Sequence, residues 1–163
     1  MAIPEISVIL STFERPRHLE RSLSSLARQE GVEGQFEVVV TDDGSRDETP
    51  ELVQTFAETV KFPVRFETHE HRGFQLAACR NNGVRASAAP YLLFTDGDCV
   101  FPPNHLRQHL AARRSGVVRA GDCVLLDRET TASITLERIA RGGFLDDVPK
   151  QLMRRPRRLH RRA

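Results

Sequence analysis

The sequence predicts an α/β fold in which a largely parallel sheet is covered by helices on both faces. Short apolar runs rich in β-branched residues alternate along the chain with segments of helical periodicity. Polar clusters follow three of these runs, as expected where strands end at one edge of such a sheet. The chain has 163 residues, 39% of them apolar and 28% charged, which is the size and balance of one globular domain.

The first predicted strand, residues 6–10, is a run of apolar and β-branched residues. A helix is expected from Pro16, because proline suits the first turn of a helix. Its apolar face has the spacing i, i+4 and i+7, and consists of Leu19, Leu23 and Leu26. Gly31 and Gly34 are expected to end the helix.

The next part of the chain repeats the alternation of strand and helix. Residues 36–40 are predicted to form a second strand, and residues 64–67 a shorter third strand. Between them we expect a helix with Thr49 as its cap and Pro50 at its first position. The buried side of this helix is expected to consist of Leu52, Val53, Phe56 and Val60.

A third helix is expected to open at Gly73 and to break at residues 88–90, Ala-Ala-Pro. Its predicted core contacts are Leu76, Cys79 and Val84. A fourth strand is predicted at residues 91–95, and two prolines introduce a helix at residues 102–114. A further strand or strand pair is predicted at residues 117–126. Beyond Asp127 the pattern weakens.

The three polar clusters that follow predicted strands are Ser11-Thr12-Phe13-Glu14, Asp42-Asp43-Gly44-Ser45 and Asp96-Gly97-Asp98. In open parallel sheets ligands bind outside the carboxyl ends of the strands, so these clusters can converge on one crevice. Each cluster alone also fits a simple turn or strand end, because Asp, Gly and Ser are common turn residues. Only their combination favours a site.

The clusters suggest three kinds of contact. Asp96 and Asp98 flank a glycine, and two such carboxylates can hold Mg²⁺ or Mn²⁺ that shares its shell with substrate phosphates. An ionised carboxylate in the second cluster can accept a hydrogen bond from the ring N–H of a pyrimidine base. In the first cluster, Ser11 and Thr12 leave space for a base or ribose, and Phe13 either packs against a ring or lies in the core.

Histidines and cysteines give weaker signals. His105 and His109 have a spacing that permits joint metal binding on a helix, but no glutamate lies between them, so we expect them to face solvent. Residues 69–71, His-Glu-His, are expected to form a loop. The cysteines lack a CxxC pair and are expected to be buried free thiols: Cys79, Cys99 and Cys123.

The net charge of +2 is unevenly distributed, since six arginines fall within residues 154–162. We expect no nucleic-acid partner. The first residues lack the basic start and apolar stretch of a signal peptide, which favours a cytoplasmic protein. The arginine-rich tail is either a disordered basic end or a contact with anionic lipid at the inner face of the membrane, worth roughly 1 kcal/mol per basic residue.

The order and spacing of the motifs are more specific than any one of them. They are residues 7–16 (Ser-Val-Ile-Leu-Ser-Thr-Phe-Glu-Arg-Pro), Asp42-Asp43-Gly44-Ser45, Cys79-Arg80-Asn81-Asn82-Gly83 and Thr95-Asp96-Gly97-Asp98-Cys99. In this order the chain closely resembles family-2 glycosyltransferases, from residue 5 to about residue 126.

The resemblance implies a GT-A (Rossmann-like) fold and a nucleotide-diphosphate-sugar donor, with uracil as the favoured base. The acceptor would be a glycan or a lipid-linked molecule, and transfer would be inverting and dependent on Mn²⁺ or Mg²⁺. Base and ribose would be held by Ser11, Thr12, Phe13 and Asp43, with Asp42 beside them. Arg80 would lie near the diphosphate or sugar, Asp96 near ribose or sugar hydroxyls, and Asp98 would ligate the metal, with Asp96 as a further candidate ligand.

This chain departs from the family pattern in two ways. Glu14, in the donor-binding segment, stands where the family often has Asn. The family's general base is a later carboxylate beside the acceptor, and no acid beyond Asp122 has a convincing context; Asp146 and Asp147 are weak candidates. We therefore divide the chain into a donor-binding domain, residues 1–126, and a partial acceptor-side region with the basic tail, residues 127–163.

Three alternatives remain open. The chain can be a truncated transferase that binds nucleotide without transferring sugar. Residues 96–100, Asp-Gly-Asp-Cys-Val, also fit the nucleophile motif of haloacid-dehalogenase-type phosphatases, although that motif normally follows the first strand. A receiver-type signalling domain shares an acidic pair on a doubly wound sheet, but there too the pair follows the first strand.

Overall fold

The computed structural model describes residues 3–121 and 123–144. The chain forms two compact units, Met1–Arg113 and Arg114–Ala163. The described part of the second unit contains two short helices, α5 (Arg128–Ser133) and α6 (Leu136–Ala140). The boundary between residues 113 and 114 reflects how the chain packs. The boundary at residue 126, between a donor-binding and an acceptor-side part, stays a prediction.

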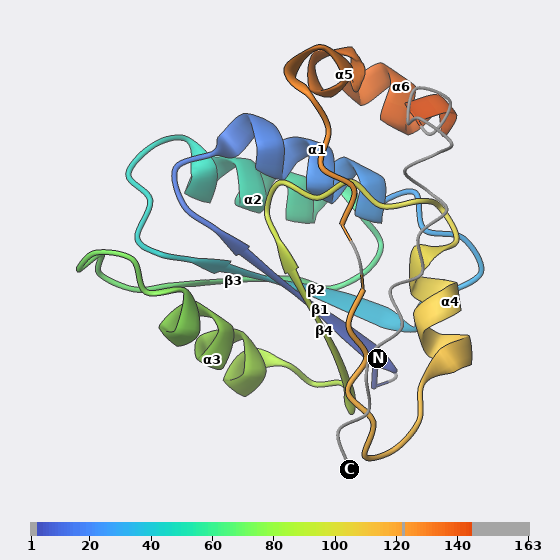
Figure 1. The fold of residues 1–163 in the computed structure, drawn as a ribbon. Coiled ribbons are helices and arrows are strands. Elements are labelled where there is room, and N and C mark those ends of the chain that lie inside the picture. The colour runs from blue at the N-terminus through green and yellow to red at the C-terminus, as the bar shows by residue number, and fades with distance from the viewer. Residues whose placement is uncertain (1–2, 122, 145–163) are drawn as a thin grey trace. The chain divides into compact units, whose positions relative to one another are not determined.

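The first unit is built on a sheet of four parallel strands in the order β3-β2-β1-β4 (Figure 1). The strands are β1 (Ile6–Thr12), β2 (Phe36–Asp42), β3 (Val64–Thr68) and β4 (Tyr91–Asp96). The two central strands are buried along their whole length. The predicted α/β class and parallel sheet are therefore confirmed.

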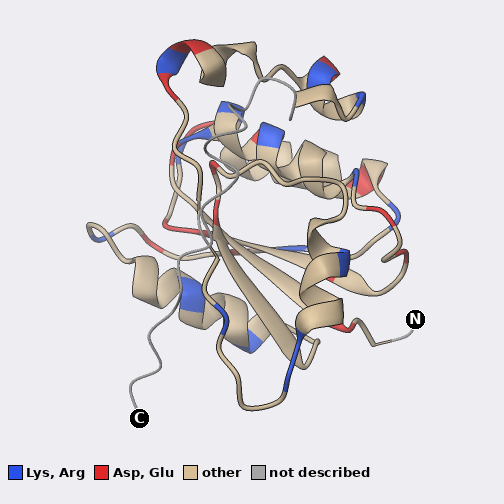
Figure 2. Ribbon diagram, turned by 45° about the vertical axis from the view of Figure 1, so that its right-hand side comes forward, with Lys and Arg blue, Asp and Glu red and all other residues tan. Residues whose placement is uncertain are grey.

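Helices α1 (Pro16–Leu26) and α2 (Thr49–Thr59) lie on one face of the sheet, and α3 (Leu76–Ala86) lies on the other (Figure 1). Helix α4 (His105–Ala112) follows β4. Alternate strand residues on the α1 face form the main core with leucines of α1 and α4: Val8, Leu10, Val38, Val40, Leu19, Leu23, Leu26 and Leu106. Figure 2 shows the strands largely free of charge, with charged residues mainly on loops and helices.

Helix α3 approaches the opposite face closely, because Gly83 lies against β1 and β2. A Cβ atom at this position would be 2.4 Å from Ile9 Cγ2 and 2.9 Å from Thr41 Cγ2. The glycine therefore sets the distance between helix and sheet, and this distance places the first turns of α3 at the sheet edge.

The strand or strand pair predicted for residues 117–126 does not form in the described residues of that segment, 117–121 and 123–126. The exposed fractions of Val118 and Leu125 are 95% and 89%. The apolar residues of this segment form two short runs, 117–118 and 123–126, separated by Arg119, Gly121 and Asp122. Each run is shorter than a typical strand of about five to six residues, and this explains why the prediction was wrong.

Helix starts also differ from the expectation. Thr49 is the first residue of α2 rather than its cap, and its backbone N–H donates to the Asp47 carboxylate (3.0 Å). Helix α3 begins at Leu76, three residues after Gly73. Val84, expected in the core, has an exposed fraction of 42%.

The cysteines do not behave alike, since Cys79 is buried, Cys99 is partly buried and Cys123 is exposed. The expectation of buried thiols is therefore confirmed for Cys79 only. His105 and His109 are half-buried rather than solvent-facing, with their ring centroids 4.6 Å apart. Among the described residues, no helix has the length and apolar character needed to cross a bilayer.

Candidate functional site

The three polar clusters meet at one edge of the sheet, because β1, β2 and β4 run parallel and end together (Figure 1). Thr12 pairs with Asp42, and Ser11 pairs with Asp96. Backbone hydrogen bonds continue beyond the strands, from Asp43 N to Thr12 O (3.1 Å) and from Gly97 N to Ser11 O (2.7 Å). Residues more than fifty positions apart in sequence are thus held side by side.

Asp42 organises the loop after β2. Its Oδ2 accepts hydrogen bonds from the backbone N–H groups of Gly44 (3.1 Å) and Ser45 (2.8 Å) and from the Thr68 hydroxyl (2.8 Å). Its Oδ1 accepts from the Ser45 hydroxyl. Asp42 has no exposed surface. The structure therefore places this candidate donor contact inside the turn, where its carboxylate already has its partners.

Asp43, the next residue, points into a polar cluster and keeps an exposed fraction of 5%. Its Oδ1 lies 3.0 Å from His69 Nε2, and its Oδ2 accepts from the backbone N–H of Gln75 (2.9 Å). Its backbone carbonyl accepts from His71 Nδ1 (2.8 Å). The carboxylate is thus held from two sides by segments that follow β3.

Phe13 lies beside this cluster and stacks on His71. The ring centroids are 4.3 Å apart and the ring planes differ by 9°. Phe13 is half-buried, so it is neither a core residue nor a fully exposed one. An aromatic surface therefore lies next to the Asp43 carboxylate.

His69 and His71 were missed by the sequence analysis, which treated residues 69–71 as loop. The signal was available in the topology, because β3 pairs in parallel with β2 and ends at Thr68, opposite Asp42. Residues that follow β3 must therefore reach the same edge. The strand itself was predicted at residues 64–67, but its place beside β2, which puts its end opposite Asp42, was not.

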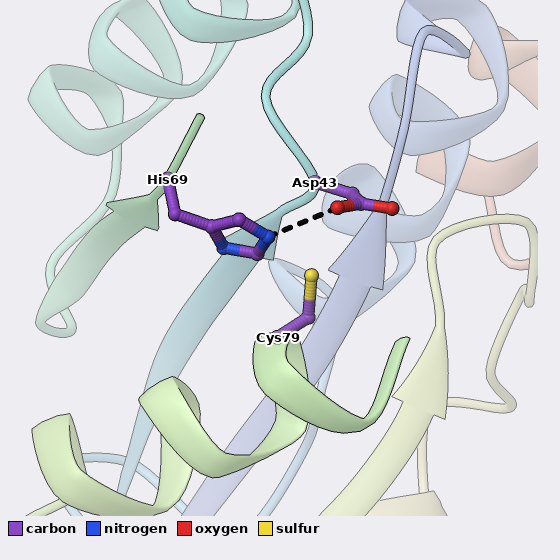
Figure 3. Close-up of side chains that lie close together, drawn as sticks. All are labelled: Asp43, His69 and Cys79. Atoms are coloured by element: carbon purple, nitrogen blue, oxygen red, sulfur yellow. Dashed lines mark hydrogen bonds and ion pairs between the residues drawn. The ribbon is translucent and has the colours of Figure 1, made fainter. Parts of the chain in front are cut away.

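His69, Asp43 and Cys79 form the one group of at least three His, Cys, Asp or Glu side chains, within the described ranges, whose ligand atoms lie within 4.8 Å of one another (Figure 3). The sequence predicted its metal site elsewhere, at Asp96 and Asp98. Burial, and then the carboxylates of Asp43 and Asp42, raise the pKa of the Cys79 thiol to about 11. Within the cluster, Asp43 and His69 are joined by a hydrogen bond, and a cation bound here would have to displace the proton of the Cys79 thiol.

The Asp-Gly-Asp turn after β4 lies directly over the end of β1. A Cβ atom at Gly97 would be 3.0 Å from Ser11 O and 3.1 Å from Thr12 Cβ, so the turn has little room for any other residue. The hydroxyl of Ser22 in α1 donates to Gly97 O (2.9 Å). Helix and strand together fix the turn that carries Asp96 and Asp98.

Both carboxylates of this turn are exposed and each faces an arginine. Asp96 Oδ1 lies 3.2 Å from Arg80 Nη2, and Asp98 Oδ2 lies 3.4 Å from Arg15 Nη1. Exposed pairs of this kind contribute only about 0–1 kcal/mol, so a cation can replace either arginine as partner. Two exposed carboxylate groups beside a glycine fit a hard divalent cation that shares its shell with phosphate oxygens.

Three buried polar atoms at this edge have no hydrogen-bond partner within the described residues, namely Thr12 Oγ1, Gln75 Oε1 and Arg80 Nε. Buried polar groups in folded proteins are nearly always hydrogen-bonded. The Ser11 hydroxyl, in contrast, accepts from Thr41 Oγ1 (3.1 Å). Thr12, Gln75 and Arg80 therefore each keep one polar atom without a partner, and a ligand at the edge reaches these buried atoms only when the groups that cover them move.

Glu14 adopts a left-handed backbone conformation with φ of 46°, and its backbone N–H donates to the Ser45 hydroxyl (2.8 Å). Asparagine tolerates this conformation better than glutamate does. This gives a physical reason for an Asn at the corresponding place in the family. The Glu14 side chain is exposed.

Two of the described acids of the second unit, Asp127 and Glu137, have structural roles. Asp127 caps α5 by accepting from Thr130 N (2.7 Å), and this bond lowers the pKa of its carboxyl. Glu137 pairs with Arg141 along α6 (2.6 Å). The candidate bases Asp146 and Asp147 lie outside the described residues, as does the arginine-rich tail.

A shallow groove of about 660 Å³ lies beside α3 and β4 and is lined by Phe74, Leu76, Ala77, Arg80, Asn81, Val84 and Phe94. It is mainly apolar, and Arg80 is its one charged lining residue. The groove does not include the Asp43 cluster, so the strand ends and not the groove carry the converging polar groups.

Comparison with known proteins identifies the class. The model of glycosyl transferase family 2 matches residues 7–132, and the chain belongs to this family. It is 36% identical over 110 residues to validoxylamine A glucosyltransferase of Streptomyces hygroscopicus subsp. limoneus, a match that covers 68% of this chain and 24% of that protein. It is 34% identical over 104 residues to hyaluronan synthase of Pasteurella multocida, covering 64% of this chain and 10% of the synthase.

Solved structures agree in fold. Staphylococcus aureus TarS 1-349 in complex with UDP superposes with a TM-score of 0.61 at 27% identity, covering 66% of this chain and 31% of that one. The mannosyltransferase PcManGT from Pyrobaculum calidifontis, in complex with GDP-Man and Mn²⁺, gives a TM-score of 0.53 at 30% identity, covering 62% of this chain and 29% of that one. The predicted GT-A fold is thereby confirmed. The comparisons favour a glycosyltransferase over the two alternatives of a phosphatase and a receiver-type signalling domain. The chain spans about a quarter of the length of the glucosyltransferase.

Proposed function

We propose that the edge formed by β1, β2 and β4 binds a nucleoside-diphosphate sugar, with UDP as the nucleotide, for transfer to a glycan or lipid-linked acceptor. The observation that carries the proposal is the convergence of Asp43, Thr12 and the Asp96-Gly97-Asp98 turn on one edge. The relatives crystallised with UDP and with GDP-Man support a ligand of this class.

In this proposal the base lies at Asp43. Uracil has one ring N–H, and an ionised carboxylate can only accept a hydrogen bond. Asp43 is nearly buried, so such a bond would be shielded from water and stronger than an exposed one. Phe13 supplies an aromatic surface at this position, and Thr12 Oγ1 offers a free donor for ribose or phosphate.

The diphosphate would lie at the Asp-Gly-Asp turn. Asp98, with Asp96 as a second ligand, would hold Mn²⁺ or Mg²⁺, and the bound metal supplies Lewis-acid stabilisation of the departing diphosphate. Arg80 and Arg15 already lie within 3.4 Å of these carboxylates. They are therefore placed to turn toward phosphate oxygens once a cation binds the carboxylates.

The experiment that tests the base site is calorimetric titration of UDP into wild type and Asp43→Ala. Loss of a charge-assisted hydrogen bond costs roughly 1.5–3 kcal/mol, so we expect the affinity for UDP to fall by about tenfold or more. Glu48→Ala is the matched control, since it also removes a negative charge from the segment between β2 and α2. The Glu48 side chain is exposed and makes no capping hydrogen bond to α2.

Glu48→Ala is expected to bind UDP as the wild type does. Equal UDP affinity in wild type and Asp43→Ala would contradict the placement of the base. Wild-type protein that binds no uridine nucleotide at all would contradict the proposed function.

A second candidate function is nucleotide-sugar binding without turnover. Inverting transfer requires a base to deprotonate the acceptor hydroxyl, and general-base help is worth roughly 10²–10⁴-fold. Of the described acids of the second unit, Asp127 caps α5 and Glu137 pairs with Arg141, and Asp146 and Asp147 remain the candidate bases. The chain matches only part of its relatives, so activity of the chain alone is a separate question.

We expect the chain alone to transfer sugar slowly or not at all, although it binds nucleotide. The measurement is a multiple-turnover assay with a panel of UDP-sugars, mixed glycan and lipid-linked acceptors, and Mn²⁺. Robust turnover that Asp146→Asn or Asp147→Asn abolishes would contradict this expectation and identify the base. Binding at the cytoplasmic face of a membrane through residues 154–162 also stays a prediction.

A further inference from the structure

The Asp43 carboxylate is connected to the outer side of α3 by a chain of side-chain hydrogen bonds. Arg85 Nη1 donates to Asn82 Oδ1 (3.1 Å), Asn82 Nδ2 lies 3.3 Å from His69 Nδ1, and His69 Nε2 lies 3.0 Å from Asp43 Oδ1. Arg85 is exposed, whereas Asn82 and His69 are half-buried. None of these three residues belongs to the proposed donor contacts.

The direction of this chain determines which nitrogen of His69 carries the proton. A guanidinium can only donate, so Asn82 Oδ1 must face Arg85 and its NH₂ group must face His69. An NH₂ group also only donates, so His69 Nδ1 is the acceptor. In the neutral ring Nε2 then carries the hydrogen and donates to Asp43 Oδ1.

The result is a carboxylate whose orientation is set by two donors from different segments. His69 Nε2–H holds Oδ1, and the backbone N–H of Gln75 holds Oδ2 (2.9 Å). His71 Nδ1 donates to the backbone carbonyl of Asp43 (2.8 Å). Rotation of the carboxylate about its Cβ–Cγ bond would break both side-chain bonds, so its remaining lone pairs point in fixed directions.

We propose that Asn82 and His69 are positioning residues that make Asp43 selective for a base with a ring N–H. This inference rests on the proposed function. A fixed acceptor matches the N3–H of uracil, whereas the lone pair at N3 of cytosine would face it with like polarity. With the opposite tautomer, His69 would present its own lone pair to Asp43 and push the carboxylate out of position.

The first test needs no nucleotide. Long-range ¹H–¹⁵N correlation spectra of the imidazoles are expected to show His69 as the Nε2–H tautomer in wild type and a mixture of tautomers in Asn82→Ala. Alanine is a good helix former, so this variant is expected to keep α3 folded. A wild-type His69 that carries its proton on Nδ1 would overturn the inference.

The second test measures base discrimination by calorimetry with UDP, CDP and N3-methyl-UDP, which lacks the N–H. Wild type is expected to prefer UDP over both analogues by at least tenfold. His69→Ala and Asn82→Ala are expected to reduce this preference about tenfold, mainly through weaker UDP binding. His69→Gln, whose amide can also donate to Asp43, is expected to recover part of it.

Glu70→Ala is the matched control, because Glu70 lies between the two histidines and its carboxylate pairs with exposed Arg72 (2.7 Å) and not with Asp43 or His69. It is expected to leave the preference unchanged. UDP binding that depends on Asp43 but keeps full discrimination in His69→Ala and Asn82→Ala would overturn this inference and leave the proposed function standing. Absence of UDP binding by wild type would overturn both.

Discussion

At the scale of single residues, neighbouring acids at the strand ends have opposite environments. Asp42 is buried and accepts three hydrogen bonds from its own turn and a fourth from Thr68 at the end of β3. Asp43 is held by segments that follow β3. The sequence Asp-Asp-Gly-Ser does not reveal this difference. It depends on Thr68 and His69, which lie 26 residues further along the chain.

His105 gives a prediction at the same scale, because burial, with a smaller contribution from His109, lowers the pKa of His105 to about 4. The unfolded chain, with an ordinary histidine pKa near 6.5, binds more protons between these values. The stabilising contribution of the neutral ring is therefore complete above about pH 6.5 and is lost as the pH falls toward about 4.

We expect the free energy of unfolding to fall by up to about 2 kcal/mol between pH 7 and pH 5 through this residue. Urea denaturation of wild type and His105→Phe at both pH values measures it. Phenylalanine keeps the ring beside Phe101, whose centroid is 5.0 Å away, but cannot be protonated. Identical pH dependence in the two proteins would contradict the assignment.

At the scale of elements, α3 carries the residues that connect the sheet to the site. Its start donates to Asp43 through Gln75, its middle contributes Cys79 and Arg80, and its end is tied to the sheet by Glu37. Glu37 is buried in β2 and accepts from Ala88 N (2.6 Å) and from the Ser7 hydroxyl (2.6 Å). The height of the helix above the sheet therefore affects the contacts that Gln75 makes with Asp43 and Arg80 makes with Asp96.

Gly83→Ala tests this dependence. The added methyl group would overlap Ile9 and Thr41, and overpacking of a core typically costs about 1–3 kcal/mol. We expect that loss in the free energy of unfolding by urea denaturation, together with weaker UDP binding because α3 moves away. Gly121→Ala is the control, since a Cβ atom there has no neighbour within 4 Å. Equal stability of Gly83→Ala and wild type would contradict the account of this contact.

Some strands could be predicted from the sequence, and other features of the same scale could not. The strands β1, β2 and β4 were predicted because their apolar runs are strong and each ends in a polar cluster. The segment 117–126 was mispredicted because its apolar residues form two short runs, 117–118 and 123–126, separated by Arg119, Gly121 and Asp122. The role of residues 69–71 was missed because the sequence does not show that β3 lies beside β2 and ends opposite Asp42.

At the scale of the whole molecule, parallel topology explains the site. Motifs at residues 11–14, 42–45 and 96–98 converge because every strand runs the same way and ends at the same edge. That convergence could be predicted from alternation alone. The identity of the hydrogen-bond partners could not, since each depends on a side chain from a distant segment.

The central claim is that Asp43 and the Asp-Gly-Asp turn form one nucleotide site in which a metal joins the turn to the diphosphate. The most direct measurement is calorimetry of UDP binding with and without Mn²⁺, in wild type, Asp98→Ala and the exposed-charge control Glu51→Ala. A cation removes the repulsion between diphosphate and the two carboxylates, so wild type and Glu51→Ala are expected to bind UDP at least tenfold more tightly with Mn²⁺. Asp98→Ala is expected to lose most of that gain. UDP binding that is independent of Mn²⁺ in wild type and Asp98→Ala alike would contradict the claim.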